Sequence, residues 1–388
     1  MTKKLRLVVV AHDFPYPPNH GGRVDIWNRI LALKKMGIPV FLIAWSKEEI
    51  KEEALEVISQ YVDDYMVFTL NTSPLIVLDP INPSFVVARR IEVSLYKKLL
   101  DKVQVFQPTC VLLDGIAGGI LAKKISEYFY IPLSYRSHNV EYEYAKALYK
   151  AEKKMVYKVA RWLNIYKTFF YENRIRSLSQ SIFEVSICDK QHWRNSSNVY
   201  LLNPIIDNST VYSSNTSDDE KDIDILFVGN LSTPNNIYGI NWMIENVVPY
   251  LENVYMVFAG SNPSTELIDL CKQNEINIIA NPVTTGDLFN RAKVLINPIW
   301  HGSGINIKMI EMLYTGRPIV STSLGTRGIP SVLLNYVSIC DEPHAFANAI
   351  IERIHESTSN EQIRLAENHY SYNHVSLLIS ELTSTLNK

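Results

Sequence analysis

Short apolar runs rich in β-branched residues alternate with helix-length segments along this chain, and the alternation stops once and then restarts. The first series comprises Leu5–Ala11, Pro39–Ala44, Tyr65–Thr69, Thr109–Leu113, Leu133–Tyr135 and Ile182–Ser186, and the second comprises Ile223–Gly229, Tyr255–Ala259, Asn277–Ala280, Val294–Ile296 and Pro318–Ser321. Such alternation is typical of parallel sheets flanked by helices. Because 388 residues are too many for one ordinary core, we predict an α/β fold of two Rossmann-like domains facing each other across a cleft.

A polar stretch separates the two series. It is dense in Ser, Asn and Asp and poor in apolar residues, which indicates a linker at residues 204–222. The predicted domains are therefore residues 1–203 and 223–369.

Composition and charge exclude several classes of protein. The net charge of −2 gives no global attraction to nucleic acid. Four dispersed cysteines without a C-x-x-C pair predict neither a disulfide framework nor a zinc site. No run reaches the length of a membrane span, and the amino-terminal apolar run is too short for a signal peptide. We therefore expect a cytoplasmic protein.

The segment 297–328, NPIWHGSGINIKMIEMLYTGRPIVSTSLGTRG, carries the strongest chemical signal. Gly302 and Gly304 allow backbone N–H groups to approach an anion, and a helix predicted from Ile305 would add its amino-terminal amides. Lys308 and Glu311 follow on one side of that helix, as a cation for phosphate and a carboxylate for a ribose diol would. A glycine-rich turn followed by a surface ion pair explains the same residues. From the residues alone, both interpretations stand.

The segment 145–176 is basic and aromatic. Lysines and arginines outnumber acidic residues here, and an apolar stripe recurs at helical spacing: Met155, Val159, Trp162, Tyr166 and Phe169. We predict one amphipathic helix, with two interpretations. Its stripe packs on its own domain, or the helix contacts an anionic membrane surface.

The segment 297–328 resembles the carboxy-terminal signature of the GT-B glycosyltransferases of family 4: G-x-G, a lysine, a glutamate, G-x-P-[IV]-V and a second glycine-containing loop. Further segments resemble other parts of that family in the expected order: HDFPYPPNHGGR (12–23), RSHNVE (136–141), LFVGNLSTPNN (226–236) and YSYNH (370–374). The last match implies a final helix, about 370–388, that packs back on the first domain.

The resemblance implies a role for each matching residue. His138 would hydrogen-bond the transferred sugar, Lys308 would neutralise the phosphates and Glu311 would bind the ribose. The implied donor-binding residues are Gly21, Gly22, Asn230, Asn281, Gly302, Ser303, Gly304, Ile305, Asn306, Lys308, Glu311, Thr326 and Arg327. Asn281 would meet the base through the backbone of its turn. Outside the family context, a satisfied loop histidine is the favoured explanation of His138, and Gly21 and Gly22 are explained as a turn before a helix.

Three positions depart from the family pattern. Ser303 stands where the first glutamate of a Glu-x7-Glu motif is usual, which puts the identity of the sugar in doubt. The loop after Gly229 has Asn230 and Asn235 in place of the basic residues of many relatives. Lys308 is then the main remaining cation, with Arg23 or Arg327 as a candidate helper. Arg327 stands at a commonly acidic position, so it is either such a helper or an exposed side chain.

The resemblance implies a retaining transferase that moves a sugar from a UDP or GDP type donor to a hydroxyl of a glycan or lipid-linked acceptor. Cell-surface polysaccharide or glycoconjugate biosynthesis is the expected setting, with peripheral contact at the inner face of the membrane through the basic helix. No cofactor, metal or nucleic acid is expected. The D-x-D sequence at Asp222 and Asp224 lies at a strand entrance, so we interpret it as structural. The alternatives are a GT-B-like sugar-nucleotide epimerase, or a catalytically weakened homologue that binds a nucleotide sugar or a partner enzyme.

Overall fold

A computed structural model describes residues 4–18, 21–152, 154–193, 196–206, 221–282, 285–302 and 304–386, except the side chains of 151 and 156. These residues form two compact units. The first contains the chain up to Pro18, Gly22–Ile205 and the chain from Tyr372 onward, and the second contains Gly21 and Ile206–Ser371. Most of the predicted linker lies outside the described residues.

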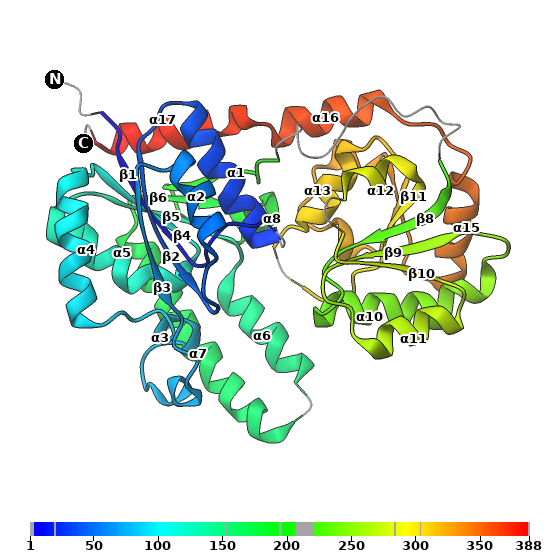
Figure 1. The fold of residues 1–388 in the computed structure, drawn as a ribbon, viewed down its shortest axis with the longest axis horizontal. Coiled ribbons are helices and arrows are strands. Elements are labelled where there is room, and N and C mark those ends of the chain that lie inside the picture. The colour runs from blue at the N-terminus through cyan, green and yellow to red at the C-terminus, as the bar shows by residue number, and fades with distance from the viewer. Residues whose placement is uncertain are drawn as a thin grey trace. The chain divides into compact units, whose positions relative to one another are not determined.

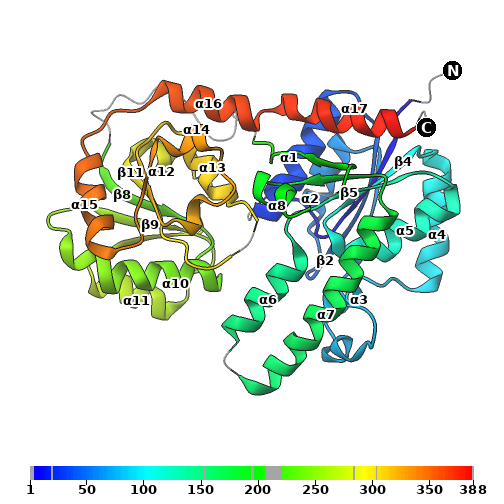
Figure 2. The same ribbon diagram turned by 180° about the vertical axis from the view of Figure 1, so that it is seen from behind.

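The first unit is built on a parallel sheet flanked by helices on both faces (Figures 1 and 2). In its described residues the strand order is β3-β2-β1-β4-β5-β6-β7. The strands are β1 (Leu7–Ala11), β2 (Val40–Ser46), β3 (Asp64–Thr69), β4 (Cys110–Asp114), β5 (Leu133–Arg136), β6 (Ser181–Glu184) and β7 (Val199–Leu201). The helices are α1 (Gly21–Lys35), α2 (Glu52–Tyr61), α3 (Ser84–Val87), α4 (Val93–Phe106), α5 (Gly119–Phe129), α6 (Glu141–Ala151), α7 (Met155–Leu178), α8 (Ile187–His192) and α17 (Val375–Leu386), with short 3-10 turns η1 (Pro74–Leu78), η2 (Ile116–Gly118) and η7 (Tyr372–His374).

Strand β1 shows why these runs are apolar without a break. Leu7 and Val9 point into one core, whereas Val8 and Val10 point into the core on the other face of the sheet. Successive strand residues point to opposite faces, so a strand covered on both sides must be apolar at every position. Helix α17 contributes Leu378 to the same core as Leu7 and Val9, which ties the end of the chain to its beginning.

The second unit repeats the architecture with the strand order β10-β9-β8-β11-β12-β13 in its described part, again parallel. The strands are β8 (Ile223–Val228), β9 (Met256–Gly260), β10 (Asn277–Ala280), β11 (Ala292–Asn297), β12 (Ile319–Ser321) and β13 (Val337–Ile339). The helices are α10 (Pro234–Trp242), the π-turn η4 (Met243–Val247), η5 (Val248–Tyr250), α11 (Thr265–Gln273), α12 (Gly286–Arg291), α13 (Ile307–Tyr314), η6 (Leu324–Thr326), α14 (Ser331–Leu334), α15 (Pro343–Arg353) and α16 (Asn360–Tyr370).

Two helix predictions are wrong in detail. The helix expected from Ile305 begins at Ile307, because Gly304 has φ +70° and Asn306 is extended. The helix expected over 145–176 is a hairpin of α6 and α7. The side chain of Glu152 accepts hydrogen bonds from the main-chain N–H of Lys154 and from Arg161, at 3.0 and 2.9 Å, and so holds the turn.

Candidate functional site

Both sheets have a topological switch point, where the chain leaves neighbouring strands in opposite directions. It lies between β1 and β4 in the first sheet and between β8 and β11 in the second. Ligands of open α/β sheets bind beyond the carboxyl ends of the strands at such points. The predicted site residues follow these strands in each unit: His138 follows β5, beside β4, while Asn230 follows β8 and the glycine loop follows β11.

In the second unit, the loop between β11 and α13 exposes backbone near a helix start. Gly302 and Gly304 have φ +145° and +70°, conformations that side chains rarely adopt. Asn306 is the N-cap residue, but its side chain donates to Asn297 Oδ1 at 3.3 Å instead of capping α13. The first turn of α13 is therefore not capped by this side chain, and its amides can bind an anion.

Lys308 and Glu311 lie in the first turns of α13 and are half-buried. The ammonium of Lys308 donates to Asn236 Oδ1 at 3.2 Å and lies 4.2 Å from the centre of the Phe227 ring. Burial lowers the pKa of Lys308 to about 7, against the opposite effect of Glu311. Burial also raises the pKa of Glu311 to about 7, against the effect of Lys308. Both groups are thus poised to change charge when a ligand arrives.

Asn236 is a site residue that the sequence analysis missed. Its amide nitrogen donates to the main-chain oxygen of Asn230 at 2.8 Å, while its oxygen accepts from Lys308. Asn230 has its own side chain turned back on the loop, where it accepts from Ser232 N and Oγ at 2.9 and 2.7 Å. The loop after β8 therefore orients Lys308 through Asn236, and Asn230 shapes that loop.

The remaining predicted donor residues lie in two other loops of the second unit. Thr326 is buried in η6 and donates to Ser323 O at 2.9 Å, and half-buried Arg327 follows it. The side chain of buried Asn297 donates to Gly325 O at 3.0 Å and accepts from Asn306. Asn297 thereby joins the loops after β11 and β12, a role not foreseen from the sequence.

Asn281 directly follows β10 and has a left-handed backbone at φ +51°. Its N–H donates to Gly260 O at 2.8 Å, and its side chain accepts from Asn262 N at 2.9 Å. It therefore shapes the turns after β9 and β10. Ser303 lies outside the described residues.

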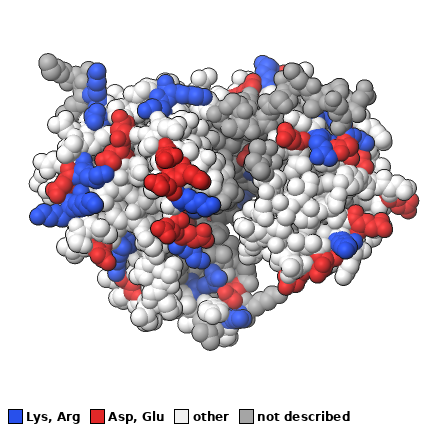
Figure 3. Space-filling model, viewed as in Figure 1, with Lys and Arg blue, Asp and Glu red and all other residues white. Residues whose placement is uncertain are grey.

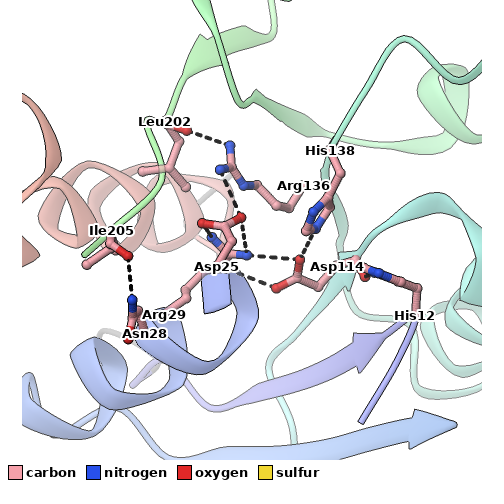
Figure 4. A network of polar contacts seen from close by, with 9 residues as sticks. All are labelled: His12, Asp25, Asn28, Arg29, Asp114, Arg136, His138, Leu202 and Ile205. Atoms are coloured by element: carbon pink, nitrogen blue, oxygen red, sulfur yellow. Dashed lines mark hydrogen bonds and ion pairs between the residues drawn. The ribbon is translucent and has the colours of Figure 1, made fainter. Parts of the chain in front are cut away.

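In the first unit, His138 joins a buried polar network (Figure 4). Its Nε2 lies 2.6 Å from Asp114 Oδ1. Arg29 binds Asp114 through Nε at 2.9 Å and Nη2 at 3.0 Å, and also pairs with Asp25 at 3.0 Å. Arg136 donates to Asp25 at 3.2 Å. The positive charges of the two arginines balance the negative charges of the two aspartates, which reduces the energetic cost of burying them.

Asp114 is ionised in this network. Burial acts to raise the pKa of Asp114, but the charge of Arg29 and the hydrogen bond with His138 hold it well below its usual range. An ionised carboxylate only accepts, so His138 Nε2 carries a proton and donates. In neutral His138, Nδ1 is then the acceptor nitrogen. Asp114 thus sets which nitrogen of His138 can receive a hydrogen bond.

His12, after β1, lies edge-on to His138 with ring centroids 5.0 Å apart. Its Nδ1 is 3.3 Å from the main-chain oxygen of Asp114. Burial, aided by the charges of His138 and Arg89, lowers the pKa of His12 to about 3, so this ring is neutral at physiological pH. A Cβ at Gly115 would lie 2.4 Å from His12 Nδ1, so the approach requires glycine there.

The other predicted residues, Gly21, Gly22 and Arg23, lie in the first turn of α1. Gly21 and Gly22 are the first two residues of α1 and are half-buried. Arg23 is paired with Asp13 at 2.8 Å, which engages the guanidinium proposed to assist Lys308. Asp25, Arg29 and Asp114 were missed, although the carboxylate that ends the apolar run CVLLD was a usable signal.

Metal ligands are absent from what the structure describes: no group of three or more His, Cys, Asp or Glu could hold an ion there. Asp222 and Asp224 pair with Arg291 at 2.5 Å and Lys293 at 2.7 Å. No helix among the described residues is long and apolar enough to cross a membrane.

Comparison with known proteins identifies the second unit. Residues 222–356 match the family described as glycosyl transferases, group 1. The chain therefore contains a group 1 glycosyltransferase domain. This range contains the loop after β8, the glycine loop, Lys308 and Glu311, so the family match covers the candidate site of the second unit.

Known proteins are similar to the chain over nearly its whole length, one in sequence and others in structure. An uncharacterized 44.6 kDa protein in the cps region of Klebsiella pneumoniae is 27% identical over 381 residues, covering 89% of this chain and 90% of that protein. HepE of Anabaena, solved with UDP and glucose, superposes with a TM-score of 0.68 at 11% identity, covering 98% of this chain and 100% of HepE. Sucrose-phosphate synthase of Thermosynechococcus elongatus gives 0.70 at 10% identity, covering 99% of each chain. The glycosyltransferase thus has the GT-B fold predicted for it.

Proposed function

We propose that this glycosyltransferase moves a sugar, with retention at the anomeric carbon, from a UDP or GDP type donor to a hydroxyl of a glycan or lipid-linked acceptor. One observation carries the proposal. The start of α13, which the side chain of Asn306 does not cap, lies with the cation of Lys308 and the carboxylate of Glu311 at the switch point of the second sheet. In a nucleoside diphosphate, the helix start would bind the phosphates, Lys308 would balance their charge and Glu311 would accept hydrogen bonds from the ribose.

The donor site is assigned as follows. The backbone of Gly302, Gly304, Ile305 and Asn306 receives the diphosphate, and Lys308 balances the charge that grows on the leaving group. Glu311 accepts from the ribose hydroxyls. Asn230, Thr326 and Arg327 shape or line the phosphate-side loops, Asn281 presents backbone to the base, and Gly21 and Gly22 at the start of α1 are also assigned to the diphosphate. The known complex of HepE with UDP and glucose supports a UDP donor.

The transfer needs orientation more than a strong base. The acceptor oxygen attacks the anomeric carbon from the side of the leaving group, the bond between that carbon and the diphosphate oxygen breaks, and the leaving diphosphate takes the acceptor's proton. The Nδ1 atom of His138 accepts a hydrogen bond from a hydroxyl of the sugar and so holds the sugar in place. The position of a Klebsiella relative in a cps region supports a role in cell-surface polysaccharide synthesis.

A panel of UDP-, GDP- and TDP-sugars tests the function. We expect slow hydrolysis of one donor without acceptor, and transfer when membrane glycolipid is added. Conversion of the donor to another sugar nucleotide would identify an epimerase instead, and binding without any turnover would identify a binding module.

The site assignment has its own test in two truncations. Lys308→Ala and Glu311→Ala should each weaken binding of the nucleotide diphosphate on the order of tenfold or more, because each removes a charge-assisted contact. The control Lys272→Ala changes an exposed lysine of α11 in the same unit. Unchanged affinity in both site variants would disprove the assignment.

A further inference from the structure

Helix α7 turns its apolar stripe away from the protein. The apolar side chains of this face, which we call the hairpin face, are Met155, Val159, Trp162, Leu163, Tyr166, Phe169 and Phe170. Exposed fractions are 76% for Met155, 45% for Trp162 and 69% for Phe170. The interpretation that the stripe packs on its own domain is therefore wrong. Contiguous exposed apolar surface of this kind marks an interaction site.

The inward side of α7 explains why the stripe faces outward. Thr168, Tyr171, Glu172 and Ile175 are buried there. Glu172 accepts from the main-chain N–H groups of Glu141 and of the residue after it, at 3.0 and 3.1 Å, and so caps the start of α6. These polar contacts fix the rotation of α7. Turning the stripe inward would break the cap that Glu172 forms, and no charged group of the stripe would replace it.

A second segment extends the hairpin face. The turn η1 and the residues after it expose Leu75, Val77, Leu78 and Ile81. The ammonium of Lys167 donates to the main-chain oxygens of Val77, at 3.3 Å, and of Asp79, so this loop is bound to α7. Both ribbon views place α3, which follows the loop, beside α7 (Figures 1 and 2). Two stretches distant in sequence thus form one apolar surface.

The hairpin segment that carries this surface is rich in basic residues. From residue 141 to 167 the sequence has seven lysines and arginines against three glutamates, although the whole chain has a net charge of −2. Two of the glutamates are paired, Glu143 with Lys146 and Glu152 with Arg161. Elsewhere the visible surface of this unit mixes both signs (Figure 3). The hairpin face is therefore locally cationic. A second copy of it would bring like charges together.

We propose that the hairpin face binds the surface of an anionic phospholipid bilayer. Its aromatic and leucine side chains enter the boundary between headgroups and acyl chains, and Lys150, Lys154 and Lys158 contact lipid phosphates. This partner rests on the proposed transfer to a lipid-linked acceptor, which would be presented at the same surface.

Sedimentation of the full-length protein with vesicles tests the proposal. We expect binding to vesicles of phosphatidylcholine with phosphatidylglycerol, little binding to phosphatidylcholine alone, and weakening by salt. The double variants Lys154→Glu with Lys158→Glu, and Leu75→Ser with Leu78→Ser, should each lower vesicle partition on the order of tenfold or more. Matched controls on exposed positions of α4, Lys97→Glu with Lys98→Glu and Val93→Ser with Val105→Ser, should bind like the wild type.

The outcomes separate this proposal from the transferase proposal. Donor hydrolysis in solution should be the same in the hairpin-face variants and in the wild type, which also shows that these variants are folded. Equal binding to both kinds of vesicle, or hairpin-face variants that bind like wild type, would overturn the membrane proposal and leave hydrolysis untouched. Self-association that is lost in the Leu75→Ser with Leu78→Ser variant, without vesicle binding, would also overturn it.

Discussion

At the scale of single residues, the function of His138 depends on Asp114. Asp114 accepts from His138 and from Nε and Nη2 of Arg29, and Arg29 also donates to Asp25. Asp25 and Arg29 come from α1, Asp114 ends β4 and His138 follows β5, so three segments of the first unit meet here (Figure 4). Such a network orients its members more sharply than an isolated pair would, because every displacement leaves a buried polar atom unpaired.

The variant Asp114→Asn tests this positioning. We expect kcat to fall about 10- to 100-fold with little change in donor KM, because the His138 ring loses its ionised partner and its fixed tautomer. The pH dependence of kcat should change as well, which a purely structural role would not produce. Asp63→Asn, a carboxylate that accepts from Val40 N in the same unit, is the control. Wild-type kcat with an unchanged pH profile would contradict the role.

Lys308 makes a second prediction at this scale. With its pKa near 7, this group is largely neutral above that value, whereas a bound diphosphate favours the ammonium. Donor binding should therefore take up a proton, and donor affinity should fall by up to about tenfold per pH unit above pH 7. Calorimetry in buffers of different ionisation enthalpy measures both effects.

Two variants sharpen the Lys308 prediction. Lys308→Arg keeps its charge and should make the affinity nearly independent of pH above neutrality. Glu311→Gln removes the charge that favours the ammonium, so the decline in affinity should begin at lower pH. A wild-type affinity that is flat from about pH 6 to pH 9 would contradict the titration of Lys308.

At the scale of elements, the loop before α13 determines where the helix can start. Gly304 in the left-handed region ends the loop two residues before the helix, and Asn306 is then used to bind Asn297 rather than to cap. A helix start that binds an anion needs an N-cap side chain that does not cap it, because a side-chain cap would occupy the amides that the ligand should contact.

Gly304→Ala tests this loop against Gly37→Ala. Both glycines have φ near +70°, so each substitution should cost about 1 to 2 kcal/mol of folding stability through backbone strain. Nothing lies within 4 Å of a Cβ built at Gly37, which makes its cost purely conformational. Only Gly304→Ala should also weaken nucleotide binding. Equal nucleotide affinity in both variants would show that the loop does not meet the diphosphate.

At the scale of the whole molecule, the chain has separate cores in its two units, and the end of the chain belongs to the first. Leu378 of α17 is buried with residues of β1, whereas Phe258 of β9 is buried in the second unit. Residues almost 370 positions apart in sequence therefore contribute to one core. Chains with separate cores commonly depart from two-state unfolding.

Calorimetric unfolding tests this division. Leu378→Ala and Leu112→Ala should lower the same transition, because both leave a cavity in the first core and each costs about 2 to 5 kcal/mol. Phe258→Ala should lower the other transition, and that transition should rise when a nucleotide diphosphate is bound. If Leu378→Ala and Phe258→Ala lowered the same transition, the two cores would not unfold independently.

Much of the fold follows from the sequence alone. Strands covered on both faces must be continuously apolar, so β1, β4, β8 and β11 were predicted to within about two residues. Helix boundaries were less accurate at α13 and at the α6–α7 hairpin, since a positive φ at Gly304 and a side-chain contact of Glu152 decide them. The amino-acid pattern shows neither the positive φ of Gly304 nor the side-chain contact of Glu152.

The sequence by itself determined the two parallel sheets, their order along the chain and the group 1 motif with Lys308 and Glu311, because periodicity and local motifs are properties of neighbouring residues. Only the tertiary structure decided which side of α7 faces outward, that Asp114 holds His138, and that Asn236 and Asn297 organise the loops around α13. These are contacts between residues distant in sequence. Their geometry depends on which strands lie side by side, and a period or a motif does not specify that.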